Sequence, residues 1–132
     1  MSSKCGKISV GISSTDDSIN FKDGCGFLMA KILSAPPYES KYNLFILLHG
    51  GCLKYGLTNS AYQERYGEQN PYASFLTDMS QKCVKIKICQ LCITNMGFKD
   101  SELLPFVKPV AYMEDYIIQF QIKKDHAILY AW

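Results

Sequence analysis

The sequence predicts an α/β protein, a three-layer α/β/α sandwich on a mostly parallel five-stranded sheet, formed by one domain over residues 1–132. Strand-like and helix-like segments alternate in the order β-α-β-α-β-α-β-α-β, which is typical of parallel strands joined by right-handed crossovers. Tyr42–Leu48 is almost continuously apolar, as expected for a strand that is buried on both faces. The chain is also long enough to bury one core without metal or disulfides.

The N-terminal half is predicted to hold two strands and one helix. Apolar residues alternate in the first strand, Lys7–Ile12. The hydroxyls of Ser13-Ser14-Thr15 are candidate N-caps for the helix that follows, and Pro36-Pro37 lies just beyond its end. Tyr42–Leu48 is the second strand. Leu53–Gln69 is rich in Tyr, Asn and Gly and is expected to combine short helical turns with a loop.

The C-terminal half continues the alternation. Asn70 and Pro71 are a helix start, with Asn as N-cap and Pro at the first helical position. Charges that match the helix dipole at both ends, Glu114 and Lys124 among them, indicate the last helix. The remaining predicted segments are strands at Val84–Ile88, Val107–Tyr112 and Ala127–Tyr130, with a short helix between Cys89 and Gly97.

Cys89 lies where the central strand passes into the short helix. Free backbone N–H groups at a helix start carry a partial positive charge that favours a thiolate over a thiol. Cys92 follows three residues later, so both sulfurs can lie on one helix face. His49 follows the preceding strand, and parallel strands end at the same sheet edge, where such folds bind ligands. His49 is therefore a candidate to orient or deprotonate Cys89.

Five further residues are predicted to shape a small-ligand pocket around these groups. They follow three neighbouring strands and are Gly50, Gly51, Cys52, Gln90 and Met113. A simpler interpretation is that Cys89 is a buried core cysteine and that His49 only caps its strand. Cys52 could also join Cys89, Cys92 and His49 in a zinc site, but a second close-spaced ligand pair is missing, so no metal is predicted.

Composition excludes several classes of protein. The net charge is +2 and the lysines form no basic stripe, so no nucleic acid is expected. The longest apolar run is too short for a membrane span, and the N-terminus lacks a signal-peptide pattern. Six cysteines without an export signal predict free thiols in the cytoplasm, with Cys25 and Cys83 as small core residues. No phosphate or dinucleotide loop is present, and no cofactor is predicted.

Five segments resemble the DsrE/DsrF-like family of small α/β proteins associated with intracellular sulfur relay. They are His49-Gly50; Ala61-Tyr62 to Tyr66-Gly67; Asn70-Pro71-Tyr72; Val84 to Cys89; and Leu103-Leu104-Pro105 with Val107. The resemblance implies a homo-oligomer, a trimer or hexamer, with Cys89 at the position of the family's characteristic cysteine. It also implies that a cysteine carries sulfur as a persulfide and exchanges it with a donor or acceptor protein. The most similar subgroup has a Cys-Gly-Gln-Ser-like turn, whereas this chain reads Cys89-Gln90-Leu91-Cys92. The second cysteine is therefore a departure from the pattern of that subgroup.

Three functional hypotheses follow. The first is a small sulfur-handling protein in which Cys89 accepts sulfur, Cys92 is a resolving or second thiol, and His49 with its glycines shapes the site. The second is a non-catalytic oligomeric module that binds a small ligand or a partner. The third is a thiol/disulfide redox protein that uses the Cys-x-x-Cys pair.

Overall fold

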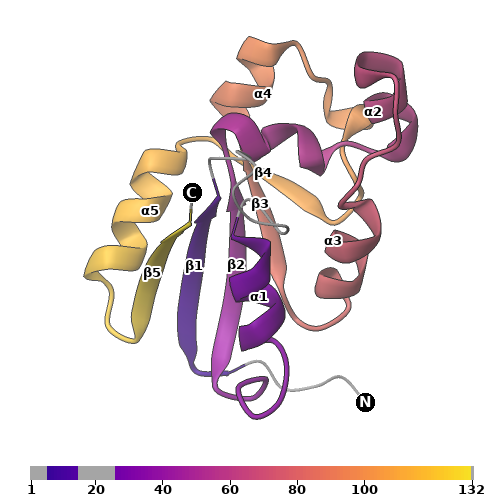
Figure 1. Ribbon diagram of the computed structural model, residues 1–132. Coiled ribbons are helices and arrows are strands. Elements are labelled where there is room, and N and C mark those ends of the chain that lie inside the picture. The colour runs from indigo at the N-terminus through magenta and orange to yellow at the C-terminus, as the bar shows by residue number, and fades with distance from the viewer. Residues whose placement is uncertain (1–5, 15–25, 132) are drawn as a thin grey trace.

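The computed structural model describes residues 6–14 and 26–131. Its five strands form one sheet in the order β4-β3-β2-β1-β5, and every pairing between them is parallel (Figure 1). The strands are β1 (Ile8–Ser14), β2 (Tyr42–Leu48), β3 (Lys85–Cys89), β4 (Val107–Val110) and β5 (His126–Ala131). The helices are α1 (Phe27–Leu33), α2 (Asn59–Tyr66), α3 (Ala73–Ser80), α4 (Gln90–Met96) and α5 (Met113–Ile122), with 3-10 helices η1 (Gly50–Gly56) and η2 (Asp100–Glu102). The predicted α/β fold class is confirmed.

Helices cover both faces of the sheet. On one face α5 packs against β1 and β5, and its Phe120 ring lies 5.2 Å from the Phe45 ring of β2. Gly11 of β1 faces this helix, and a Cβ built there would lie 3.2 Å from Phe120. The opposite face is covered by α1, which contacts β1 and β2, and by α3, which contacts β3. Figure 1 shows α1 crossing in front of β2, with α5 at the β5 side of the sheet.

The strand β2 lies inside the sheet between β1 and β3. Its consecutive residues Ile46, Leu47 and Leu48 are all fully buried. Successive side chains of a strand point to opposite faces, so both faces of β2 are covered. The prediction that was made from its continuous apolar run is therefore correct.

One predicted helix start is wrong, and another was placed two residues early. Ser13 and Ser14 belong to β1 and do not cap a helix; Thr15 and the residues that follow to Cys25 lie outside the described part of the chain. The helix expected from Pro71 begins instead at Ala73. Asn70 Oδ1 accepts the Tyr72 N–H at 3.0 Å, as expected of a cap, and its Nδ2 also donates across the fold to the carbonyls of Tyr55 (2.9 Å) and Leu57 (2.7 Å).

Most other boundaries agree with the predicted ones to within one or two residues. The region of unclear pattern, Leu53–Gln69, contains most of η1 together with all of α2, as expected of short helical turns. Within the described ranges, no helix is both long enough and apolar enough to cross a membrane.

Candidate functional site

The site begins where β3 passes into α4, as the sequence predicts. Cys89 ends β3 and is the N-cap of α4, with extended backbone (φ −68°, ψ 113°). Its Sγ accepts a hydrogen bond from the backbone N–H of Cys92 at 3.2 Å. The cysteine sulfur thus takes the place that a Ser or Asp oxygen usually takes at a helix start. Gly97 ends the helix in the left-handed region, at φ 75°.

The turn after β2 lies beside this helix. Leu48 pairs with Ile88 in the sheet, so His49 and Cys89 are the next residues along two neighbouring strands. Gly50 adopts φ 59°, a left-handed conformation that glycine permits, and the chain turns there into η1. η1 contacts α4, and the backbone N–H of Gly50 lowers the pKa of Cys92. The expected meeting of the His49-Gly50 turn with the cysteine pair is therefore present.

His49 is held by a residue that the sequence analysis did not single out as part of the site. Its Nε2 lies 2.8 Å from Ser13 Oγ, at the end of β1. Burial lowers the pKa of His49, and the negative charge of Glu114 partly opposes that shift. The imidazole is consequently neutral at pH 7. Within residues 6–14 and 26–131, the His49 side chain hydrogen-bonds to Ser13 and not to a cysteine. The role of His49 as a base for Cys89 therefore stays a prediction.

Cys92 is a half-buried thiol with a pKa raised to about 11. Burial is the largest cause, followed by a hydrogen bond from its thiol to the Cys89 sulfur and by the charge on Cys89. The Gly50 N–H acts in the opposite direction, and Glu114 adds a smaller upward shift. Cys92 therefore holds its proton at pH 7.

Glu114 is a second group that sequence reasoning undervalued. It lies in the first turn of α5, where its charge alone suits the helix dipole. Its field nevertheless reaches both His49 and Cys92. The only signal in the sequence is its position after a fourth parallel strand, which ends at the same sheet edge.

The prediction of free thiols is wrong for two of the cysteines. Cys52 and Cys83 are disulfide-bonded, whereas Cys89 and Cys92 are free. Cys52 is also fully buried, so it offers neither a thiolate ligand for zinc nor a free thiol to a pocket. Over the described ranges no group of three or more His, Cys, Asp and Glu could hold a metal ion.

The remaining predicted pocket residues lie in different surroundings. Gly51 is exposed at the start of η1. Gln90 is half-buried, and its Nε2 donates to Thr94 Oγ1 at 3.3 Å on the same helix. Met113 is only 1% exposed and packs in the hydrophobic core. Gly51 and Gln90 are therefore accessible from solvent, whereas Met113 is a core residue and not part of an open pocket wall.

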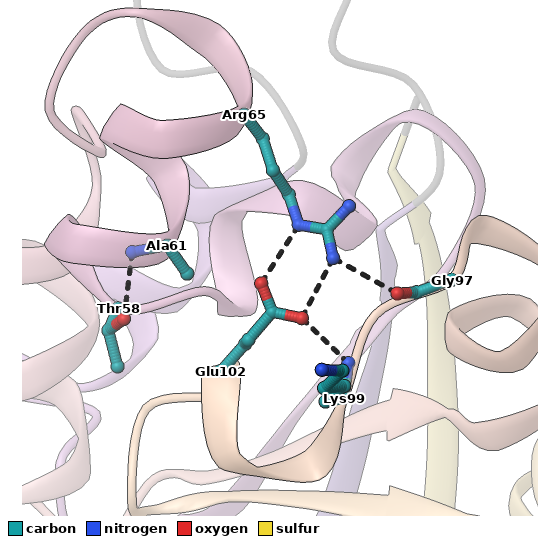
Figure 2. Close-up of polar contacts among 6 residues, drawn as sticks. All are labelled: Thr58, Ala61, Arg65, Gly97, Lys99 and Glu102. Carbon is teal, nitrogen blue, oxygen red and sulfur yellow. Dashed lines mark hydrogen bonds and ion pairs between the residues drawn. The ribbon is translucent and has the colours of Figure 1, made fainter.

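An ion pair holds the segment that leaves α4 (Figure 2). Arg65 of α2 binds both carboxylate oxygens of Glu102, at 3.0 and 2.8 Å, and its Nη2 also donates to the Gly97 carbonyl at 3.0 Å. The Glu102 carboxylate in turn accepts the backbone N–H of Lys99 at 2.9 Å. These contacts fix the C-terminal end of α4 from outside, while Cys89 caps its N-terminal end.

Comparison with known proteins agrees with this architecture. The model of the DsrE/DsrF-like family matches residues 23–130. Among solved structures, a protein of unknown function, MTH1491 from Methanobacterium thermoautotrophicum, superposes with a TM-score of 0.68 at 12% sequence identity, covering 95% of this chain and 98% of that one. At this identity the likeness concerns the fold alone. A search of the curated proteins found no match.

Proposed function

We propose that this protein, which belongs to the DsrE/DsrF-like family, handles sulfur as a persulfide on Cys89. Cys92 is the second thiol, and His49, Gly50 and Gly51 shape the site. The observation that carries the proposal is the hydrogen bond of 3.2 Å that the Cys89 sulfur accepts from the backbone N–H of Cys92 at the start of α4. Backbone N–H groups at a helix start are a surrounding typical of reactive cysteines, and the thiolate is the nucleophile in sulfur exchange.

The loading step needs only a donor persulfide, RSSH. The Cys89 thiolate attacks the outer sulfur of the donor, a new S–S bond forms to Cys89, and the donor S–S bond breaks. The outer sulfur keeps its proton, and the donor leaves as the thiolate RS⁻. The product is a persulfide on Cys89, and no external oxidant or reductant is consumed.

Access to Cys89 requires α4 to move, because Cys89 is only 2% exposed. The helix is weakly anchored: Ile93 is its one buried residue, whereas Leu91 and Met96 are 58% and 55% exposed. Few buried apolar contacts make local opening inexpensive. A sulfur donor would therefore reach Cys89 during brief opening of the start of α4.

The burial of Cys89 is also what favours a second candidate, a non-catalytic oligomeric module that binds a small ligand or partner. In that case Cys89 is a core residue and does not react with persulfides. The two functions differ in whether the native protein accepts sulfur, so one experiment separates them.

Self-association and location are further parts of the proposal. A trimer or hexamer would cover Tyr112, Ile118 and Ile122, which are 74%, 48% and 69% exposed on and beside α5. Exchange with a sulfur-donor or acceptor protein follows from the same role. A cytoplasmic location is proposed from the sequence, and the disulfide-bonded Cys52 and Cys83 count against it, because disulfides persist mainly in oxidising compartments.

Intact-mass spectrometry of the native protein after exposure to glutathione persulfide tests the proposal. We expect Cys92→Ser to gain one sulfur atom that a thiol reductant removes, since this variant keeps Cys89 and the backbone N–H that stabilises it. Cys89→Ser is the matched control and should not gain that sulfur. Absence of a Cys89-dependent adduct in folded protein would refute sulfur carriage and leave the binding module.

A further inference from the structure

We infer that Cys92 discharges the Cys89 persulfide within the same chain, releasing hydrogen sulfide and leaving a Cys89–Cys92 disulfide. The inference rests on the proposed loading of Cys89 and adds a reaction to it. A carrier with one thiol must pass its sulfur to another molecule. A chain with this pair instead reduces the bound sulfur itself.

The two cysteines are already held side by side. The Cys92 backbone N–H donates to the Cys89 sulfur at 3.2 Å, and the Cys89 side chain is among the groups that raise the pKa of Cys92. An external thiol must first displace α4 to reach Cys89, which is 2% exposed, whereas Cys92 lies on that helix beside it. A reaction between neighbouring groups also avoids the entropy of a bimolecular encounter. The geometry therefore favours Cys92 over any second molecule as the attacking group.

The step balances without a further reactant. The Cys92 sulfur attacks the inner sulfur of the persulfide, which is Cys89 Sγ, and the S–S bond to the outer sulfur breaks. The outer sulfur takes the bonding electrons and leaves with its own proton and the proton of Cys92, as H₂S. The two cysteine sulfurs are oxidised to the disulfide, and the outer sulfur is reduced to sulfide.

Loading itself would prepare Cys92 for attack. Burial is the first cause of its raised pKa, and the hydrogen bond and the charge of Cys89 come next. When Cys89 becomes a protonated persulfide, its Sγ no longer carries the negative charge that raises the pKa of Cys92. The Gly50 N–H, which favours the Cys92 thiolate, stays in place. Cys92 therefore holds its proton in the empty site and loses it more readily in the loaded one.

The pair must then be reduced by an external dithiol, which becomes a disulfide as it restores both thiols. The other cysteines of the described chain hold no free thiol that could attack the persulfide. Cys52 is disulfide-bonded and fully buried, and Cys83 is disulfide-bonded. In a new Cys89–Cys92 disulfide, the half-buried Cys92 sulfur is the one that a reductant can reach.

The test is a single-turnover experiment without reductant. Wild type, Cys92→Ser and Cys89→Ser are loaded with glutathione persulfide under anaerobic conditions and desalted rapidly. Released sulfide and intact mass are then followed over time, with peptide mapping to locate any disulfide. Circular dichroism of each variant verifies that it is folded.

For wild type we expect about one equivalent of sulfide per loaded chain and the loss of two hydrogens, located at the Cys89–Cys92 pair. Cys92→Ser should keep the added sulfur and release no sulfide until a thiol is added. If wild type retains its added sulfur as long as Cys92→Ser does, the inference is overturned while sulfur carriage stands. If folded Cys92→Ser gains no sulfur at all, the proposed function fails, and this inference fails with it.

Discussion

Cys92 should react slowly with alkylating reagents, and removal of Cys89 should make it react faster. The pKa of Cys92 is raised by burial first, and then by the hydrogen bond and the charge that come from Cys89. Replacement of Cys89 removes the second and third causes and leaves the first. This change in rate at one cysteine, caused by mutation of the other, measures the coupling on which both proposals depend.

The size of the effect follows from two opposing terms. A pKa raised from 9.0 to about 11 reduces the thiolate fraction of Cys92 at pH 7 about a hundredfold. A more basic thiolate is also a better nucleophile, with a Brønsted coefficient of about 0.4–0.5, which returns about six- to tenfold in rate. The loss of thiolate outweighs the gain, so Cys92 should react about tenfold more slowly than an unfolded cysteine.

The assay uses iodoacetamide at pH 7 to 10, with peptide mapping to give a rate for each cysteine. Cys89→Ala removes both the hydrogen-bond acceptor and the charge, whereas Cys89→Ser keeps a neutral acceptor. The rate at Cys92 should therefore rise from wild type to Cys89→Ser to Cys89→Ala. It should stay below the unfolded rate in all three, because burial persists.

Two results would refute this reasoning. One is a Cys92 rate in wild type equal to that of a peptide with the same sequence. The other is an unchanged rate in Cys89→Ala that is verified as folded. Either result would mean that Cys89 does not control the reactivity of Cys92 in solution.

Three predictions concern stability, measured by urea unfolding. Glu102→Gln should lower the free energy of unfolding at pH 7 by about 0.5–1 kcal/mol, as expected for a solvent-screened pair. The hydrogen bond from Arg65 holds the pKa of Glu102 at about 2. The stability advantage of wild type over Glu102→Gln should therefore be full above about pH 4.3 and vanish as the pH falls toward about 2. A stability difference that does not change with pH would contradict this prediction. Gly56→Ala places a Cβ 2.8 Å from Cδ1 of fully buried Ile88 and should cost about 1–3 kcal/mol, partly recovered by adding Ile88→Val; strictly additive losses would show that the contact relaxes. Asn70→Asp removes the donor to two carbonyls at a site 6% exposed and should cost about 2–6 kcal/mol, so a loss near zero would mean that water replaces the amide.

Elements with a strong local pattern could be predicted from the sequence. The apolar run of β2 predicted burial on both faces, and Tyr42–Leu48 is the strand observed. The change from alternating to helical spacing placed the passage from strand to helix at Cys89, and Gly97 ends that helix as expected. These features depend on the order of neighbouring residues, since side-chain period and helix ends are local properties of the backbone.

The partners of the site residues could not be predicted in this way. Ser13 looked like a helix cap and in fact binds His49, which lies 36 positions away in the sequence. Asn70 looked like another cap, and its Oδ1 does accept the Tyr72 N–H, but its Nδ2 also joins the carbonyls of Tyr55 and Leu57. In both cases a short polar side chain could satisfy its hydrogen bonds locally or across the fold, and residue type does not decide between them.

The alternating order of strands and helices, the buried β2 strand and the position of Cys89 at a strand end all follow from local patterns in the sequence. Tertiary structure alone decided what surrounds that cysteine. The sheet order brings the ends of β1, β2 and β3 together, so that Gly50 reaches Cys92 and the charge of Glu114 acts on both His49 and Cys92. Burial and hydrogen bonding between distant segments set the protonation of these groups, and both exist only once the chain has folded.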